Sequence, residues 1–150
     1  MKTMMMMAAA FCLAGQAHAA VIYGVDENNN LVTFNSAAPG AILSSVALTG
    51  IDNSPGALDF RPINGVLYGL GSDRVVYTIN TGTGMATAVS SVLALTGTSF
   101  AFDFNPTIDR LRIVSNTNDN YVFNPNDGSL TNAAAVFYGA GDPNAGGNPG

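Results

Sequence analysis

The fold of this chain is decided by the stretch DFRPINGVLYGLGSDRVVYTINTGTG, residues 59–84, because this stretch is written twice. The second copy is DFNPTIDRLRIVSNTNDNYVFNPNDG, residues 103–128, and it contains no insertion or deletion. Asp59 matches Asp103, and every later pair of matching positions is separated by the same 44 residues. A constant offset over this length marks a repeated structural unit.

A third copy lies earlier in the chain. Residues 21–25 (VIYGV) and 31–35 (LVTFN) match residues 66–70 (VLYGL) and 76–80 (VYTIN) at an offset of 45. The Asp-Phe pair that opens the other two copies has no counterpart before residue 21. The first unit therefore begins at its second segment.

Each complete unit contains four short apolar segments, and these segments predict β-strands. They are rich in Val, Ile, Tyr, Phe and Thr and are bounded by Gly, Pro, Asn and Asp. The segment SSVALTG at residues 44–50 returns as SSVLALTG at residues 90–97. Residues 66–70 and 75–79 are apolar on both faces, so each strand must be covered on both sides. After residue 19, no stretch keeps the apolar spacing of a helix.

These features predict an all-β fold of four-stranded antiparallel repeats of about 44 residues, arranged as consecutive β-propeller blades. The expected units are residues 20–50, 57–97 and 100–138, followed by a tail rich in Gly, Pro and Asn at residues 139–150. A sandwich or barrel is the alternative, but neither requires strands to repeat in strict order. Three units are fewer than the ~4 to 8 blades of a closed propeller. We therefore expect residues 20–150 to form an incomplete propeller, truncated at its C-terminus.

The first 19 residues have the pattern of a signal peptide. Lys2 precedes an uncharged apolar run at residues 4–14, and Ala17-His18-Ala19 fits the small-x-small rule for cleavage before Ala20. The run is shorter than the ~20 residues needed to span a bilayer. The sequence predicts an exported protein, periplasmic or extracellular, without a membrane span after cleavage.

Cleavage would remove the only lysine, cysteine and histidine of the chain, namely Lys2, Cys12 and His18. Four arginines then face ten acidic residues, which gives a net charge of −6. This charge disfavours a nucleic-acid partner, because binding to phosphates requires clustered positive charge. Without these three residue types the mature chain has no base for a Ser-His-Asp or Cys-His system, no imidazole or thiolate for zinc, and no amine for a Schiff base.

Paired carboxylates remain available for acid–base chemistry of the glycosidase kind. Asp59 and Asp103 are the obvious pair, but they occupy the same position of the repeat. A residue that recurs in every unit is more simply structural, with a short side chain that accepts hydrogen bonds from nearby amides. The sequence therefore favours a protein without catalytic activity and leaves the question open.

Departures from the repeat are the better candidates for ligand binding. Asp109, Arg110 and Arg112 lie where the second unit has Gly65-Val66-Leu67-Tyr68, and they place two arginines on one side of a strand. Such a pair suits an anionic or sugar ligand; the alternative is pairing with aspartates between blades, Asp103, Asp109 or Asp119. A longer loop adds Asp52 and Asn53 to these candidates.

Calcium is the one cofactor for which the sequence offers ligands. Asp26, Asn28 and Asn30 present oxygen atoms at alternate positions, as at the start of a calcium-binding loop. The later Gly and bidentate Glu of such a loop are missing. Ordinary turn chemistry is the competing interpretation of these residues.

Several motifs in the expected order resemble an exported bacterial family, the domain of unknown function 4394. They are Ile22-Tyr23-Gly24-Val25-Asp26, Asp59-Phe60-Arg61-Pro62, Leu67-Tyr68-Gly69-Leu70-Gly71, Phe102-Asp103-Phe104-Asn105-Pro106, Asp109-Arg110-Leu111-Arg112, Asn124-Pro125 and Gly141-Asp142-Pro143-Asn144-Ala145-Gly146. The resemblance implies a propeller-like β-repeat protein with a signal peptide, usually longer than this chain. It implies no reaction, cofactor or catalytic residue.

Together these observations predict an exported, non-catalytic propeller-like module that binds a glycan or protein ligand or acts as a scaffold. The alternatives are an extracellular carbohydrate-active enzyme that uses acidic residues and a repeat stabilised by Ca²⁺. If the chain is not a fragment, we expect its open sheet edges to cause self-association.

Overall fold

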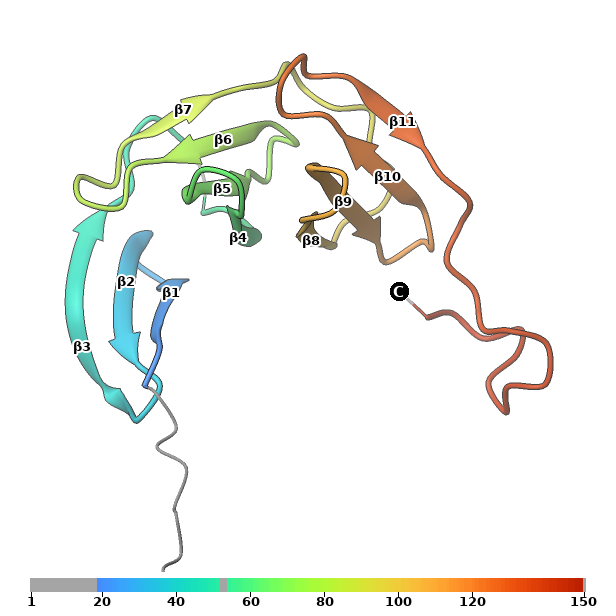
Figure 1. The fold of residues 1–150 in the computed structure, drawn as a ribbon, viewed down its shortest axis with the longest axis horizontal. Coiled ribbons are helices and arrows are strands. Elements are labelled where there is room, and N and C mark those ends of the chain that lie inside the picture. Colours follow the sequence, from blue (N-terminus) through green and yellow to red (C-terminus); the bar gives the residue numbers. More distant parts are fainter. Residues whose placement is uncertain (1–18, 52–53, 150) are drawn as a thin grey trace, which may run out of the picture.

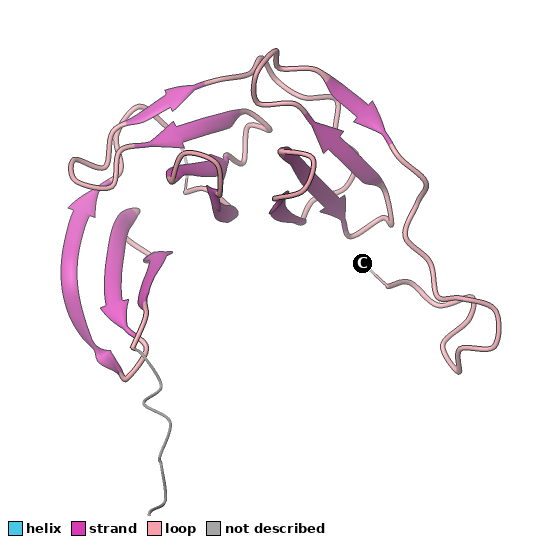
Figure 2. Ribbon diagram, in the orientation of Figure 1, coloured by secondary structure: helices cyan, strands magenta, loops and turns pink. Residues whose placement is uncertain are grey.

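The structure is a computed structural model that describes residues 19–51 and 54–149. Strands and connecting loops make up this part of the chain, and no helix occurs in it (Figure 2). The described residues therefore contain no membrane-spanning helix. The strands are β1 (Val21–Val25), β2 (Asn30–Asn35), β3 (Ala38–Ala47), β4 (Ala57–Arg61), β5 (Val66–Leu70), β6 (Val76–Ile79), β7 (Ala86–Ala88), β8 (Phe100–Asn105), β9 (Arg110–Ser115), β10 (Asn120–Phe123) and β11 (Leu130–Asn132).

The strands form three antiparallel sheets, and each sheet contains only strands that are consecutive in the sequence. The first sheet has the order β1-β2-β3, the second β4-β5-β6-β7 and the third β8-β9-β10-β11. Figure 1 shows the sheets side by side in an open arc, with β1, β4 and β8 innermost and β3, β7 and β11 on the outer rim. The prediction of an all-β fold built from antiparallel units is confirmed.

The strand register follows the offset of the sequence repeat. Asp59 lies opposite Tyr68 across β4 and β5, and Asp103 lies opposite Arg112 across β8 and β9. Phe60 and Phe104 keep the same relation to the strands that follow them. In the first sheet, the strand that matches β5 and β9 is β1, so this sheet has three strands and no counterpart of β4.

One predicted strand is wrong. Residues 90–97 form no strand, although their sequence repeats that of residues 44–50, part of which lies in β3. The partner strand β6 begins at Val76, which already accepts a backbone hydrogen bond from Val89, so the chain leaves the sheet there. The segment instead places Leu93 and Leu95 in the core between the second and third sheets.

Two apolar layers separate the three sheets. The layer between the first and second sheets contains Leu31 from β2 and Leu67, Tyr77 and Ile79 from β5 and β6. The layer between the second and third sheets contains Tyr68 and its neighbours on the opposite face of β5 and β6. The second sheet is thus covered on both faces, as its apolar sequence requires.

An edge-to-face aromatic pair recurs in both layers. Tyr23 meets Phe60 with a ring separation of 5.0 Å and an angle of 75°. Tyr68 meets Phe104 with a separation of 5.0 Å and an angle of 72°. The aromatic contact between successive sheets is therefore the same in both layers.

A close backbone contact ties the outer rims of the first two sheets. Thr49, which follows β3, forms a short parallel bridge with Met85, which precedes β7. Gly84 next to this bridge has φ +72°, and a Cβ atom there would lie 2.1 Å from the carbonyl oxygen of Ala47. Only glycine fits this position, since it combines a left-handed backbone with no room for a side chain.

Candidate functional site

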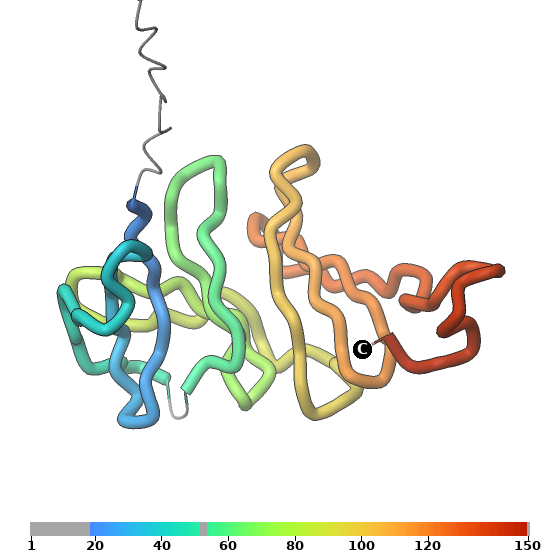
Figure 3. Tube along the Cα trace, turned by 90° about the horizontal axis from the view of Figure 1, so that it is seen from below, coloured from blue at the N-terminus to red at the C-terminus, as the bar shows by residue number. Residues whose placement is uncertain are grey.

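The hairpin connections between β4 and β5 and between β8 and β9 project on the same side of the arc (Figure 3). Arg61 at the end of β4 crosses between them. Its Nε donates a 2.8 Å hydrogen bond to Oδ1 of Asp109, and its Nη2 donates to Oδ2 of the same carboxylate. The Nη2 atom also donates to Oδ1 of Asn126 at 2.6 Å. This two-pronged ion pair joins the second sheet to the third.

The pair is strongly held in its ionised form. The hydrogen bond to Asp109 raises the pKa of Arg61 above its usual value, although desolvation acts in the opposite direction. The hydrogen bond from Arg61 lowers the pKa of Asp109 below its usual value. Asp109 has φ +50° at the position that matches Gly65, which has φ +67°. Aspartate is one of the few residues other than glycine that this left-handed turn tolerates.

Arg110 and Arg112 extend from β9 on the face of the third sheet that is turned away from the second. The residues between and after them, Leu111 and Ile113, are buried in the layer between the two sheets. Arg110 donates a 2.9 Å hydrogen bond to the carbonyl oxygen of Asp109, and Arg112 donates a 2.7 Å hydrogen bond to Oδ1 of Asn120. Among the described residues, neither arginine forms an ion pair.

The aspartates expected beside these arginines have other surroundings. Asp119 accepts hydrogen bonds from the hydroxyls of Thr96 and Thr117, and these bonds lower its pKa. Asp103 is exposed and accepts no hydrogen bond from the described part of the chain. The structure thus brings Arg110 and Arg112 to one face as predicted, while Asp109 pairs with Arg61, which the sequence did not single out.

The remaining predicted site residues fall in two places. Asp52 and Asn53 lie outside the described residues. The Asp26 carboxylate caps its own turn: Oδ1 accepts hydrogen bonds from the backbone amides of Asn28 and Asn30 at 2.9 Å and 2.8 Å, and Oδ2 accepts one from Nδ2 of Asn30. The hydrogen bond from the side chain of Asn30 is the main cause of the lowered pKa of Asp26.

Most carboxylates of the described residues accept hydrogen bonds that stabilise the fold. Asp59, for example, accepts the amide of Phe60 at 2.8 Å and, across the gap between sheets, the amide of Phe104 at 2.6 Å. Of the nine carboxylates described, seven accept hydrogen bonds that hold a turn or join two sheets. They are Asp26, Asp59, Asp73, Asp109, Asp119, Asp127 and Asp142.

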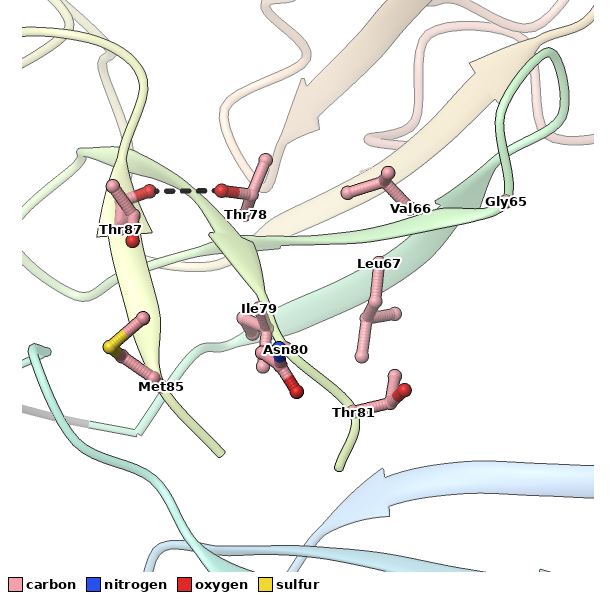
Figure 4. A pocket seen from close by; sticks show the side chains of 9 residues that line it. All are labelled: Gly65, Val66, Leu67, Thr78, Ile79, Asn80, Thr81, Met85 and Thr87. Carbon is pink, nitrogen blue, oxygen red and sulfur yellow. Dashed lines mark hydrogen bonds between the residues drawn. The ribbon is translucent and has the colours of Figure 1, made fainter. Parts of the chain in front are cut away.

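A pocket of about 410 Å³ opens at one end of the second sheet, where β5 begins, β6 ends and β7 begins (Figure 4). No titratable side chain lines it; its polar groups are hydroxyls and one amide. Thr78 donates a 3.4 Å hydrogen bond to the carbonyl oxygen of Thr87 at its wall. The lining residues are Gly65, Val66, Leu67, Thr78, Ile79, Asn80, Thr81, Met85 and Thr87.

No sequence pattern pointed to this pocket, because its residues are ordinary members of the repeat. At this end of the sheet, Leu67, Ile79 and Ala86 lie opposite one another across β5, β6 and β7. Asn80 uses its Oδ1 to accept the amides of Gly82 and Thr83 and so shapes the turn beside the pocket. The geometry can accommodate a neutral polar molecule, with hydroxyls for hydrogen bonding and Leu67, Ile79 and Met85 for apolar contact.

Comparison with solved structures finds matches in longer proteins. A protein of unknown function from Bacteroides thetaiotaomicron matches with a TM-score of 0.56 and 16% identity, over 75% of this chain and 30% of its own. A putative 6-phosphogluconolactonase from Bacteroides fragilis matches with a TM-score of 0.46 and 19% identity, over 76% of this chain and 35% of its own. This chain thus spans about a third of either protein.

No curated protein matches the sequence. The family model described as "Domain of unknown function (DUF4394)" matches residues 30–150, which is most of the chain and includes β2 to β11. By this match, the chain belongs to the DUF4394 family.

Proposed function

We propose that the chain is an exported, non-catalytic binding module built from propeller-like blades. The observation that carries this proposal is the use of its carboxylates, seven of nine of which hold turns or join sheets. A general acid or base must be free to reach a substrate, whereas these groups are engaged with backbone amides and side chains.

The pocket at the end of the second sheet is the proposed ligand site. Thr81 and Thr87 have hydroxyl groups at its rim, and Leu67 and Ile79 provide apolar surface. Sugars combine hydroxyls that need hydrogen-bond partners with apolar C–H faces, so a neutral glycan fits this lining better than a charged ligand does. The absence of titratable groups in the lining supports binding without turnover.

Two further observations support the export and the blades. Residues 1–19 have the pattern of a signal peptide. The three sheets succeed one another around an arc, and the matching strands β4 and β8 are innermost in the second and third sheets, which supports an arrangement as consecutive propeller blades. N-terminal sequencing of the secreted protein should begin at Ala20, and an intact Met1 in the mature protein would contradict the export.

A glycan array followed by titration of the tightest oligosaccharide hit tests the binding site. Thr87→Val removes one hydroxyl from the pocket and keeps the β-branched shape. Thr131→Val is the matched control, because Thr131 occupies the same position of the repeat on β11, outside the pocket. We expect a several-fold loss of affinity for Thr87→Val and none for Thr131→Val.

Equal affinities of the two variants would place the ligand elsewhere on the molecule. Release of shortened sugars from the bound oligosaccharide would overturn the non-catalytic role. An array without any hit would remove glycans as the ligand class.

A further inference from the structure

The inner edge of β1 differs from the inner edges of the matching strands. β5 pairs with β4 on this side, and β9 pairs with β8. β1 pairs with β2 on its outer side, and no described strand lies on its inner side (Figure 1). An unpaired strand edge presents free backbone N–H and C=O groups that another extended chain can use.

The repeat defines the register that such an added strand would take. In the second sheet, Leu58 lies opposite Gly69, Asp59 opposite Tyr68 and Phe60 opposite Leu67. The matching positions on β1 lie 45 residues earlier, so a strand with the sequence Leu-Asp-Phe would meet Gly24, then Tyr23, then Ile22.

The space for the leucine of this strand is already present. A Cβ atom at Gly69 would lie 3.0 Å from Cδ1 of Ile79, 3.1 Å from Cδ2 of Leu58 and 3.2 Å from Cβ of Pro55, so side chains from β6, β4 and the loop before β4 fill that space. A Cβ atom at Gly24 would meet only Cγ2 of Val32, at 3.9 Å. The surface above Gly24 is therefore open where the surface above Gly69 is covered.

The phenylalanine of the added strand would also find an uncovered partner. Ile22 is 40% exposed, whereas Leu67 in the matching position, opposite Phe60 and packed in the layer against the first sheet, is 2% exposed. Cross-strand pairs of an aromatic and a β-branched side chain are favourable in antiparallel sheets. An aromatic residue opposite Ile22 would cover part of this exposed side chain.

The aspartate of the added strand would have a specific hydrogen-bond donor on the second sheet. Asp59 of β4 reaches the amide of Phe104 on the next sheet at 2.6 Å. The matching amide is that of Phe60, which receives no carboxylate from the first sheet and donates instead to Asp59, its own neighbour, at 2.8 Å. A pocket of about 340 Å³ between β1 and the start of β4, lined by Tyr23, Val25 and residues 55–58, leaves room for the approach.

We propose that the inner edge of β1 is an acceptor site for an extended peptide strand with the sequence pattern Leu-Asp-Phe. The strand completes the first sheet to four strands by β-augmentation, with backbone hydrogen bonds for affinity and three side-chain positions for specificity. This site is separate from the pocket at the end of the second sheet, so either can fail without the other.

The test uses the purified chain and a synthetic peptide, GALDFRP, with the sequence of residues 56–62. We expect a dissociation constant of roughly 10–100 μM by calorimetry, as for a short strand with few side-chain contacts. The peptide GALAFRP, which lacks the carboxylate, should bind at least about tenfold more weakly. Hydrogen exchange should slow at the amides of Tyr23 and Val25, whose matching residues Tyr68 and Leu70 face β4.

Two protein variants complete the test. Gly24→Val fills the leucine space and should weaken GALDFRP binding at least about tenfold, while the fold is kept because an added Cβ atom meets nothing closer than 3.9 Å. Gly40→Val on β3, where a Cβ atom meets nothing within 4 Å, is the matched control and should bind normally. No binding of GALDFRP at about 1 mM, unchanged binding in Gly24→Val, or protection confined to the outer strands would overturn the proposal.

Discussion

The two layers between the sheets differ in how they are connected, although they share the same aromatic pair. Between the second and third sheets, Asp59 accepts the amide of Phe104, and Arg61 forms an ion pair with Asp109. Between the first and second sheets, the aromatic pair of Tyr23 and Phe60 is present, but no described carboxylate or guanidinium crosses. Both polar links of the later layer start from β4, the strand without a counterpart in the first sheet.

The comparison separates two contributions to the packing of repeated sheets. Each aromatic pair joins a tyrosine of a strand that all three units share, β1 or β5, to a phenylalanine on the innermost strand of the next sheet, so the pair recurs in both layers. The polar links start from the innermost strand of the earlier sheet, and they occur only where the earlier sheet has that strand. The layer between the first two sheets therefore depends on apolar packing and on the backbone bridge near Gly84.

The largest expected difference between the layers is in their phenylalanines. Phe104 is 3% exposed, so Phe104→Ala should lower the free energy of unfolding by about 3–5 kcal/mol. Phe60 is only partly buried beside the open edge of β1, so Phe60→Ala should cost clearly less. Urea unfolding followed by circular dichroism measures both. Equal losses would mean that the two layers are equally well packed.

The backbone bridge of the first layer can be broken at Gly84. Gly84→Ala should cost about 2–4 kcal/mol, because it adds left-handed strain to a clash with the carbonyl oxygen of Ala47. Gly128 is its repeat match with φ +74°, but its nearest neighbour to an added Cβ atom lies 3.8 Å away. Gly128→Ala should therefore show the strain alone, about 1–2 kcal/mol. Unfolding midpoints in urea compare the two, and a larger loss at Gly128 would contradict the role of the bridge.

The polar link of the second layer can be removed at Asp59. Asp59→Ala leaves the amide of Phe104 without its acceptor and should cost about 1–3 kcal/mol. Asp103→Ala changes the matching residue, which accepts no hydrogen bond in the described chain, and should stay within about 0.5 kcal/mol of the wild type. Denaturant titration of both variants provides the measurement. A comparable loss of stability in Asp103→Ala would show that an aspartate at this position of the repeat stabilises the fold without a hydrogen bond between sheets.

The smallest expected effect concerns the pH dependence of the ion pair. Because the folded pKa of Asp109 is lowered from 3.8, its stabilising contribution is present above pH 3.8 and is lost as pH falls through the lower folded value. Asp109→Asn should be less stable than the wild type at neutral pH, and the two should converge as the pH falls below the lowered folded pKa of Asp109. Unfolding midpoints at several pH values test this convergence. A stability gap that does not change with pH would mean that the charge of Asp109 plays no part.

The repeat in the sequence predicted much of the fold, for physical reasons that are local. A strand with apolar side chains on both faces, such as residues 66–70, must be covered by other elements on both sides. The constant offset placed Phe60 and Phe104 in matching positions. The strand predicted at residues 90–97 was wrong because strand formation depends on a partner backbone, and β6 supplies none beyond Val89.

The candidate site was less accessible to sequence reasoning. Asp109 stood out as a departure from the repeat, and Arg110 and Arg112 share a face as predicted. The partner of Asp109 did not stand out, because Arg61 lies in a regular part of the unit, 48 residues earlier. The pocket rimmed by Thr87 also had no sequence signal, since its lining residues are ordinary members of the repeat.

The sequence by itself determined that this protein is all-β and that its units repeat at a fixed offset. These properties depend on side-chain alternation along each strand and on a fixed offset, both of which can be read along one chain. The tertiary structure alone decided which carboxylates are engaged, which sheet faces are covered and which edge is open. These depend on contacts between groups that the sequence separates by about one repeat, as with Asp59 and the amide of Phe104, and only folding brings such groups together.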